Sequence, residues 1–238
     1  MSHEDLYRRI NRVKTAILHT RFGAVLRSPV GKLLRSWLFQ GMFYMAPDEL
    51  LFRLIVQTTT TAAIGWWLGV SGVMDGIVLV IVVHTLFWLG NSHFWALEIR
   101  EGQRLVKNQP QAIRQYLVGL RSRCGKCASM EQCFASGSLA RGAFGPYSDL
   151  DVACVPRPGK WHRVAVLAFG MRERFIAAMQ KMPVELYCYS TEALARISPD
   201  ERRLVLKAAA TEVGARSNWI AWDTFWETPS PFFREHEV

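Results

Sequence analysis

Charged side chains are missing from two long stretches of this 238-residue chain. Residues 54–74 contain no aspartate, glutamate, lysine or arginine, and neither do residues 76–97. About 20 apolar residues are enough for a helix to cross a hydrocarbon layer roughly 30 Å thick. The missing charge therefore argues against a wholly soluble protein. Because charges occur throughout the second half of the chain, the pattern predicts a membrane segment joined to a soluble domain.

Other features are missing as well. Residues 1–11 lack the apolar core of a secretory signal peptide. The five cysteines are an odd number, and without a cleavable signal they favour reduced thiols in a cytosolic setting. The chain also has no internal repeat and no low-complexity segment, which argues against a repeat array.

Positive charge is in excess, with a formal net charge of +9 at pH 7. This balance indicates an anionic partner, such as phospholipid head groups, nucleic acid or nucleotide phosphates. Membrane-surface attraction is the simpler explanation for the basic residues that precede the first apolar stretch, which are Arg8, Arg9, Arg12, Lys14, Arg21, Arg27, Lys32 and Arg35.

A basic amphipathic helix on the membrane surface is predicted at the end of this basic region. Its apolar face would hold Leu34, Trp37, Leu38, Gly41 and Met45. The alternative is a helix packed on the soluble domain.

A two-helix transmembrane hairpin is the predicted membrane segment. Pro47-Asp48-Glu49 has the form of a helix start, because proline fits the first turn and acids suit its positive dipole end. The predicted spans are residues 50–70 and 76–97. Gln57 and the threonines at 58–61 weaken the first span, although threonine hydroxyls can bond back to the helix backbone.

Basic residues flank this hairpin on the side away from its connection. The connection holds a single charge, Asp75, whereas Arg100, Arg104, Lys107 and Arg114 follow the second span. The positive-inside rule then predicts a multi-pass protein of the inner (cytoplasmic) membrane with both termini in the cytoplasm. A buried helical hairpin in a soluble protein is the alternative. His84 lies mid-span and is expected to bond to the partner helix, for instance to a threonine.

The predicted organisation has five parts. Residues 1–49 form the basic region, 50–97 the hairpin, 98–109 a helical connector, 110–225 the soluble domain and 226–238 a tail. Ser198-Pro199-Asp200-Glu201 has the form of a capping box, which predicts a helix ending near Val213. The late aromatic residues can dock on the domain or on lipid: Trp219, Trp222, Phe225, Trp226, Phe232 and Phe233.

Two acidic residues carry the strongest chemical signal. A short predicted strand at 132–135 runs into Gly137-Ser138-Leu139-Ala140-Arg141-Gly142, and a second strand is predicted at 148–155. Residues two apart on a strand project from the same face, so Asp149 and Asp151 aim both carboxylates at one point. Two like charges held so close need a cation between them. Hard oxygen ligands with room for phosphate favour magnesium.

A third carboxylate follows on a later strand. Residues 161–181 are predicted to be helical, and residues 184–189 alternate like a strand. A strand-helix-strand crossover can lay the new strand in the same sheet. Glu185 would then lie beside the Asp149–Asp151 pair. The predicted fold class is α+β, a mixed β-sheet flanked by helices, preceded by two transmembrane helices.

These residues resemble a known family signature. In chain order, Gly137-Ser138, Asp149-x-Asp151 and Glu185 resemble the nucleotidyltransferases of the DNA-polymerase-β superfamily. The fuller string GSLARGAFGPYSDLDV is most similar to the minimal nucleotidyltransferase group of bacteria and archaea. The resemblance covers residues 110–225, and the hairpin is no part of the family pattern. Many members of the family have aspartate at the position of Glu185, so the glutamate is a departure from the family pattern.

The resemblance implies a role for each matching position. Asp149 and Asp151 would bind two magnesium ions, and Glu185 would complete one of the two sites and help to ready the acceptor hydroxyl. Gly137 and Ser138 would hold the nucleotide phosphates, which glycine's close backbone approach and a helix start near Ser138 also favour. Arg141 would contact the triphosphate or form a structural salt bridge.

The implied reaction transfers a nucleoside monophosphate from a nucleoside triphosphate, with ATP as the expected nucleotide, to an acceptor hydroxyl and releases pyrophosphate. The expected partners are the triphosphate, the lipid bilayer and an acceptor held at the membrane, while nucleic acid is less favoured. Two alternatives stay open: a catalytically silent, membrane-tethered nucleotide sensor or scaffold, and a nucleic-acid-modifying nucleotidyltransferase.

The cysteines offer a competing metal site. Cys124-x-x-Cys127 and Cys133 could supply thiolates to zinc, with His162 as a fourth ligand. No second paired-cysteine motif occurs in the chain. Buried or loop thiols are therefore the default prediction for these residues.

Overall fold

The computed structural model of the protein describes residues 28–40, 42, 45–91, 107–190, 193, 200–209 and 216–234. The chain divides into two compact units, Met1–Phe43 and Tyr44–Val238. The basic segment before residue 28 and the predicted connector between residues 98 and 106 lie outside the described residues. The element bounds are α3 Pro29–Phe39, α4 Pro47–Trp67, α5 Val73–Asn91, α7 Pro110–Lys126, β1 Met130–Ala135, α8 Gly137–Ala140, β2 Leu150–Pro156, α9 Lys160–Met179, β3 Val184–Cys188, β4 Arg203–Lys207, β5 Trp219–Ile220, α12 Trp222–Glu227 and α13 Pro231–Arg234.

Helix α3 is the described element of the first unit. The hydroxyl of Ser28 caps it by accepting a hydrogen bond from the Gly31 N–H at 3.0 Å. Gln40 ends the helix in the left-handed conformation, with φ 45°. The predicted helix forms, but it stops before Gly41 and Met45 and therefore carries a shorter apolar face than expected.

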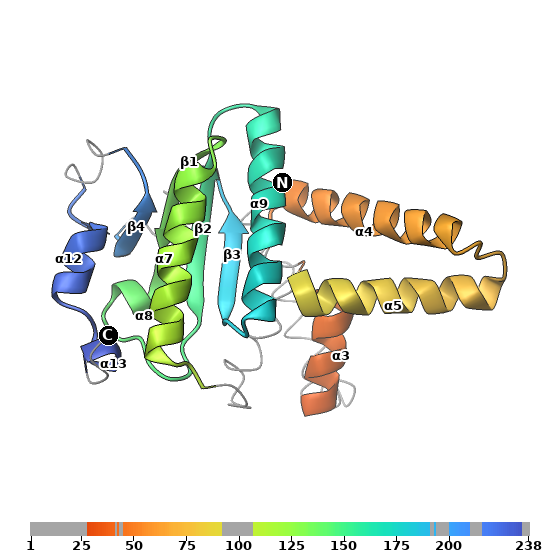
Figure 1. Ribbon diagram of the computed structural model, residues 1–238, viewed down its shortest axis with the longest axis horizontal. Coiled ribbons are helices and arrows are strands. Elements are labelled where there is room, and N and C mark those ends of the chain that lie inside the picture. Colours follow the sequence, from red (N-terminus) through yellow and green to blue (C-terminus); the bar gives the residue numbers. More distant parts are fainter. Residues whose placement is uncertain are drawn as a thin grey trace, which may run out of the picture. The chain divides into compact units, whose positions relative to one another are not determined.

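The second unit holds a five-stranded mixed sheet flanked by helices, so the α+β prediction is confirmed (Figure 1). The strand order is β3-β2-β1-β4-β5. Strand β1 pairs antiparallel with both β2 and β4, whereas β2–β3 and β4–β5 are parallel pairs. Helix α9 provides the crossover between β2 and β3, as the sequence predicts. This crossover sets the register in which Asp151 lies opposite Glu185.

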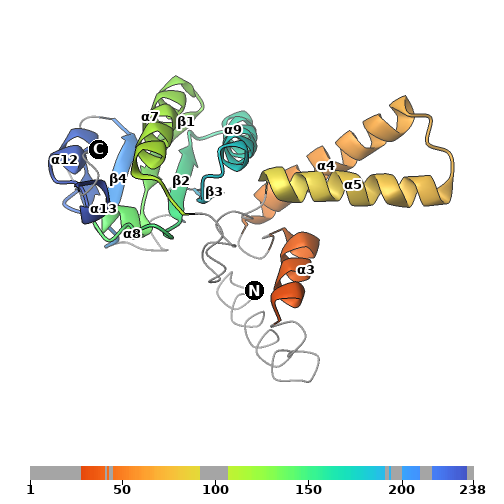
Figure 2. The same cartoon turned by 60° about the horizontal axis from the view of Figure 1, so that its bottom comes forward.

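The two faces of the sheet have different neighbours. Helices α7 and α9 cover one face of the sheet (Figure 2). Every second side chain of the central strands, such as Cys133, Val152 and Leu186, packs into the main core. Side chains of the other parity, such as Phe134 and Ala153, form a second small cluster. Alternation along the strands therefore places Asp151 and Glu185 on the face away from α7 and α9.

One secondary-structure prediction is wrong. The capping-box pattern at 198–201 predicts a helix, but residues 203–207 form β4 instead. The sequence of β4, Arg-Leu-Val-Leu-Lys, pairs with β1 through Phe134–Val205 and Ala135–Leu204. Pairing with a central strand accompanies burial of Leu204, Val205 and Leu206, and that tertiary gain outweighs the local helix signal.

Helices α4 and α5 form the predicted hairpin, but they differ in composition. Among the described helices, α5 alone is long and apolar enough to cross a membrane by length and composition, with a mean hydropathy of 2.1. Arg53, Gln57 and the threonines at 58–61 make α4 more polar. The expected pair of spans is therefore supported for α5 and not for α4. The expected bond of His84 to the partner helix is present, although its partner is the Gln57 amide at 2.9 Å instead of a threonine.

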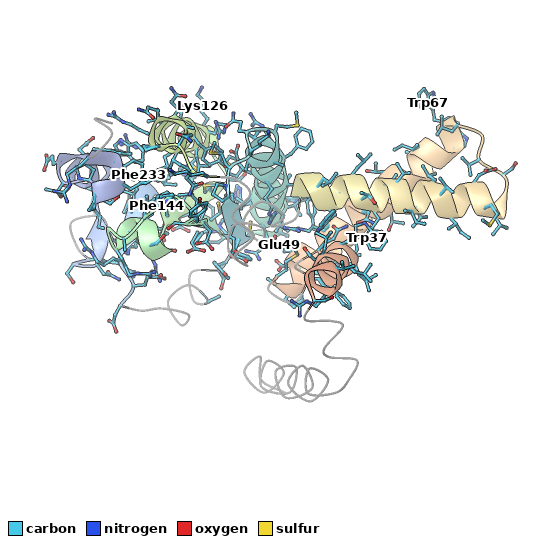
Figure 3. The ribbon with its side chains drawn as sticks, turned by 90° about the horizontal axis from the view of Figure 1, so that it is seen from below. Trp37, Glu49, Trp67, Lys126, Phe144 and Phe233 are labelled. Carbon is cyan, nitrogen blue, oxygen red and sulfur yellow. The ribbon has the colours of Figure 1, made fainter. Side chains whose placement is uncertain are left out.

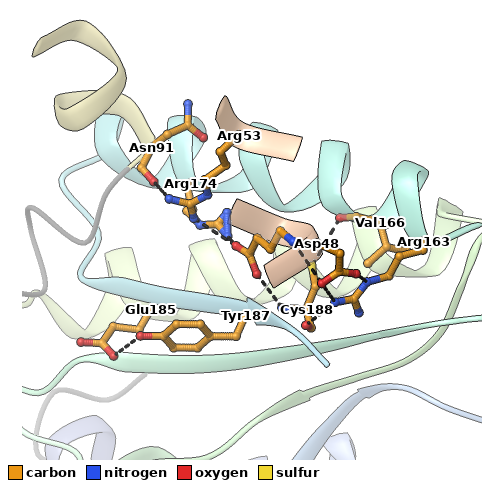
Figure 4. A network of polar contacts seen from close by, with 10 residues as sticks. Asp48, Arg53, Asn91, Arg163, Val166, Arg174, Glu185, Tyr187 and Cys188 are labelled. Carbon is orange, nitrogen blue, oxygen red and sulfur yellow. Dashed lines mark hydrogen bonds and ion pairs between the residues drawn. The ribbon is translucent and has the colours of Figure 1, made fainter. Parts of the chain in front are cut away.

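The base of the hairpin is joined to α9 and β3 by a polar network (Figure 4). Glu49 in the first turn of α4 is buried and pairs with both Arg53 and Arg174. It also accepts a hydrogen bond from the Cys188 N–H of β3 at 3.5 Å. Asp48 beside it accepts from Arg163 of α9 at 3.0 Å. The acids predicted to complement the helix dipole thus attach the hairpin to α9 and to the edge of the sheet within the second unit.

The late aromatic residues pack on the domain, which resolves the alternatives left open by the sequence. Phe225, Phe232 and Phe233 are buried in the main core. Figure 3 labels Phe233 beside Phe144, and their rings are stacked with centroids 5.9 Å apart. The loop that precedes β2 is therefore held by the C-terminal helices.

Candidate metal centre

Three carboxylates meet at one end of the central strands. Asp151 lies at the start of β2, Asp149 just precedes that strand, and Glu185 lies at the start of β3. One oxygen of each carboxylate lies within 4.8 Å of the other two. The predicted convergence of the three acids is confirmed, because parallel pairing of β2 and β3 places Asp151 directly opposite Glu185. Among the described residues, this is the one group of three or more His, Cys, Asp or Glu that could hold a metal ion.

The donor set fits a hard divalent cation. Three carboxylates supply oxygen ligands only, and Asp149 and Asp151 are partly open to solvent. Magnesium keeps several waters or phosphate oxygens and needs one or two protein carboxylates. A set that is partly buried and partly open therefore leaves coordination positions for a second ligand.

Gly137 forms the wall beside Asp151. It follows β1, begins the short helix α8, and has φ +67°, a backbone conformation that favours glycine. A β-carbon at this position would overlap Oδ2 of Asp151. The Ser136 N–H donates to the Asp151 carbonyl at 2.9 Å, which extends the β1–β2 pairing into the turn. The glycine therefore lets the backbone approach the carboxylate.

The residues around Gly137 have the features of an anion site. The Gly137 N–H donates to Oε1 of Glu201 at 3.3 Å. The Ser138 hydroxyl oxygen is buried and has no hydrogen-bond partner among the described residues. A buried hydroxyl without a partner costs about 1–3 kcal/mol. Arg141 lies one turn further on with its side chain 57% exposed.

Glu201 is a site residue that local sequence patterns do not reveal. The pattern at 198–201 is typical of a helix cap, whereas in the structure Glu201 lies two residues before β4 and lines the pocket beside Asp151. Its Oε1 lies 3.8 Å from Nη1 of Arg141. One carboxylate therefore contacts two of the three groups predicted to bind phosphate. Its position depends on the β1–β4 pairing, which no local pattern in the sequence indicates.

Aromatic residues form the other wall of this pocket, which has a volume of about 210 Å³. Phe134, Tyr187 and Tyr189 line it together with Ala153 and Arg203. The Tyr187 hydroxyl donates to Oε2 of Glu185 at 3.1 Å (Figure 4). Burial, with the neighbouring Glu185 charge, raises the pKa of Tyr187 above its usual value. This phenol therefore stays protonated and holds one oxygen of Glu185.

The competing cysteine site is not assembled. Cys133 lies between Cys124 and Cys154, with Sγ–Sγ distances of 3.4 and 3.7 Å, and all three are buried. His162 bonds to the Ser129 hydroxyl at 3.1 Å. Hydrogen bonding with Cys124 and Cys154, together with burial, raises the pKa of the Cys133 thiol well above its usual value. The Cys133 thiol is therefore a protonated core side chain, in agreement with the default prediction of buried thiols.

Comparisons with known proteins add no assignment: no protein-family model matches this sequence, and neither a curated protein nor a solved structure matches the chain. The site is therefore interpreted from its own chemistry. It combines an acidic cation centre, an adjacent backbone N–H and hydroxyl suited to an anion, and an aromatic pocket next to the third carboxylate. The three carboxylates could hold a metal ion, and the pocket beside them has room for a small ligand.

Proposed function

We propose that this protein is a membrane-anchored nucleotidyltransferase, resembling the minimal group of the DNA-polymerase-β superfamily. It transfers a nucleoside monophosphate from a nucleoside triphosphate, ATP in the first instance, to an acceptor hydroxyl. One observation carries the proposal: Asp149, Asp151 and Glu185 converge next to Gly137 and Ser138. An acidic cluster alone is common, but here it adjoins an anion-binding turn.

Each group has a distinct task in the proposed reaction. Asp149, Asp151 and Glu185 would hold two magnesium ions, which stabilise both the attacking and the leaving oxygen of an in-line displacement. The Gly137 N–H, the Ser138 hydroxyl and Arg141 hold the triphosphate. Glu185, fixed by Tyr187, orients the acceptor hydroxyl and takes its proton. The acceptor oxygen forms a bond to the α-phosphorus, the bond to the bridging oxygen breaks, and pyrophosphate leaves with its electron pair.

The membrane anchor is the second part of the proposal. The hairpin of α4 and α5 inserts into the cytoplasmic membrane, with both termini on the cytoplasmic side. Several large apolar side chains of α5 are exposed, including Val78, Val80 and Leu86. Trp66 and Trp67 are exposed at the opposite end of α4 from Glu49 (Figure 3), where tryptophans favour the interface between lipid and water. Anchoring keeps the site near the bilayer and raises the effective concentration of a membrane-bound acceptor.

Turnover is tested with full-length protein in lipid vesicles, magnesium and α-labelled triphosphates, together with a membrane extract as the source of acceptor. Wild-type protein is expected to release pyrophosphate and label one extract component. Asp151→Asn is expected to lower turnover at least a hundredfold, because a neutral amide weakens cation binding. The matched control is Asp223→Asn, an exposed aspartate in the first turn of α12, which should retain wild-type turnover.

Two results distinguish the alternatives. Nucleotide binding without pyrophosphate release would indicate a sensor or scaffold instead of an enzyme. Labelling of RNA or DNA, with a steep loss of affinity as salt is raised, would indicate nucleic-acid modification. The orientation of the anchor is tested with the variant Ser71→Cys and a thiol reagent that does not cross the bilayer. Labelling of position 71 from the cytoplasmic side of sealed vesicles would contradict the proposed orientation.

A further inference from the structure

Helix α9 presents an apolar surface that the domain core does not use. Its buried face includes Val166, Gly170 and Ala177. The opposite face holds the exposed residues Trp161, Val164, Ala165, Ala168, Arg172, Phe175 and Met179, which recur at about the helical period. Trp161 is 83% exposed and Met179 is 71% exposed. A continuous helix face of this kind is typical of a contact with another apolar phase or partner.

The first turn of α4 and the last turn of α5 both contact α9. At one end, Arg163 of α9 binds Asp48 in the first turn of α4. At the other, the ring of Phe175 lies against Gly90 in the last turn of α5, so close that a β-carbon there would be 3.0 Å from Cδ2. Residues 163 and 175 are twelve positions apart, about 18 Å along a helix. The helix therefore crosses the base of the hairpin.

This placement fixes the environment of the apolar face. Where a hairpin enters a bilayer, the structure at its base lies at the level of the lipid head groups. We infer that the outer face of α9, Trp161 to Met179, lies on the membrane surface as an in-plane helix and contacts lipid. The inference rests on the membrane anchor proposed above. Continuity with the apolar surface of α5 through the Phe175–Gly90 contact favours lipid over a second protein as the occupant.

The charges on this helix suit the same partner. Arg172 lies among the apolar residues of the face, and Lys160 is exposed at the start of the helix. A long basic side chain can lay its stem on apolar surface and extend its charge to a phosphate. Tryptophan and phenylalanine anchor interfacial helices at the boundary between head groups and acyl chains. The catalytic unit would then be held at the bilayer by three helices, not by two.

Photo-crosslinking in full-length protein tests this inference. Benzoylphenylalanine is placed at Phe175 or Met179 on the face, at Val80 in the middle of α5, and at Val118, which is 51% exposed on α7. Each variant is reconstituted in vesicles of phosphatidylethanolamine and phosphatidylglycerol, irradiated and analysed by mass spectrometry. We expect lipid adducts at 175 and 179 at yields close to that at 80 and at least fivefold above that at 118.

The possible outcomes distinguish failure of the α9–lipid contact from failure of the proposed membrane anchor. Adducts at 80 without adducts at 175 and 179 would overturn the membrane contact of α9 while leaving the anchor intact. A crosslink from 175 or 179 to a second copy of the chain would also overturn it, because the face would then be a protein interface. If position 80 also gave no lipid adduct, the anchor itself would fail, and the inference with it. Equal yields at 118 and 175 would show random collision with lipid and would count against a specific surface.

Discussion

The carboxylate of Asp151 occupies the space that a β-carbon at Gly137 would need. Gly137 also has φ +67°, so two separate constraints require glycine at this position. The contact brings a backbone N–H next to the acidic centre. In the proposed function it would join the metal ions to the phosphates, which is the arrangement that a metal–triphosphate complex requires.

Gly137→Ala is expected to weaken metal binding and abolish transfer, because the new methyl group displaces the Asp151 carboxylate. Gly142→Ala is the matched control. Gly142 has φ +75°, but a β-carbon there would meet nothing within 4 Å, so the cost is backbone strain of about 1–2 kcal/mol. Titration with Mn²⁺, followed by electron paramagnetic resonance, measures the binding. Wild-type affinity in Gly137→Ala would contradict the proposed role of this contact.

Tyr187→Phe is expected to lower kcat by about tenfold to a hundredfold with little change in nucleotide affinity. The variant removes the donor that holds Oε2 of Glu185, and a misplaced catalytic group costs about this much. Steady-state kinetics with a saturating triphosphate measure the effect. An unchanged kcat would mean that Glu185 is held by other contacts.

Glu201→Gln is expected to tighten nucleotide binding by roughly threefold to tenfold, because the Glu201 charge faces the same N–H and guanidinium that would hold the phosphates. The control is Glu227→Gln on α12, an exposed residue outside the pocket. Affinity is measured with a fluorescent, non-hydrolysable triphosphate in the presence of magnesium. Weaker triphosphate binding in Glu201→Gln would contradict this prediction. It would mean that Glu201 holds the Gly137 turn in place and does not compete with phosphate.

Tyr116→Phe is expected to stabilise the protein at alkaline pH. Burial, followed by the charge of Glu173, raises the pKa of Tyr116 above its usual value of 10.0. The unfolded chain therefore releases this proton first, and stability that is fully present below pH 10 is lost as pH rises further. The hydroxyl also has no hydrogen-bond partner among the described residues. Urea unfolding between pH 8 and 11 measures the free energy of unfolding of both proteins. If that free energy fell with pH as steeply in Tyr116→Phe as in the wild type, the prediction would be contradicted.

Local patterns predicted much of the sheet and the acidic centre. Strands β1, β2 and β3 follow from short alternating segments, and the crossover through α9 predicts that Glu185 joins Asp151. By contrast, β4 and Glu201 depend on pairing with β1, and the capping-box residues that precede them give the opposite signal. The i,i+4 spacing of Glu49 and Arg53 is visible in the sequence. Their third partner, Arg174, lies more than a hundred residues away and cannot be identified from it.

The polar network at the base of the hairpin also determines how a soluble form of this protein has to be made. Strand β3 is the last strand on its side of the sheet. At that open edge Glu49 accepts from the Cys188 N–H, and Arg163, paired with Asp48, donates to the Cys188 carbonyl. Truncation before residue 107 would leave Arg174 without its carboxylate and expose the edge to pairing with another chain, a route to aggregation. Excision is the better design. Nη1 of Arg53 donates to the Asn91 carbonyl at 3.0 Å, so a short glycine-rich loop from residue 53 to residue 91 would remove the apolar legs and retain the edge cover.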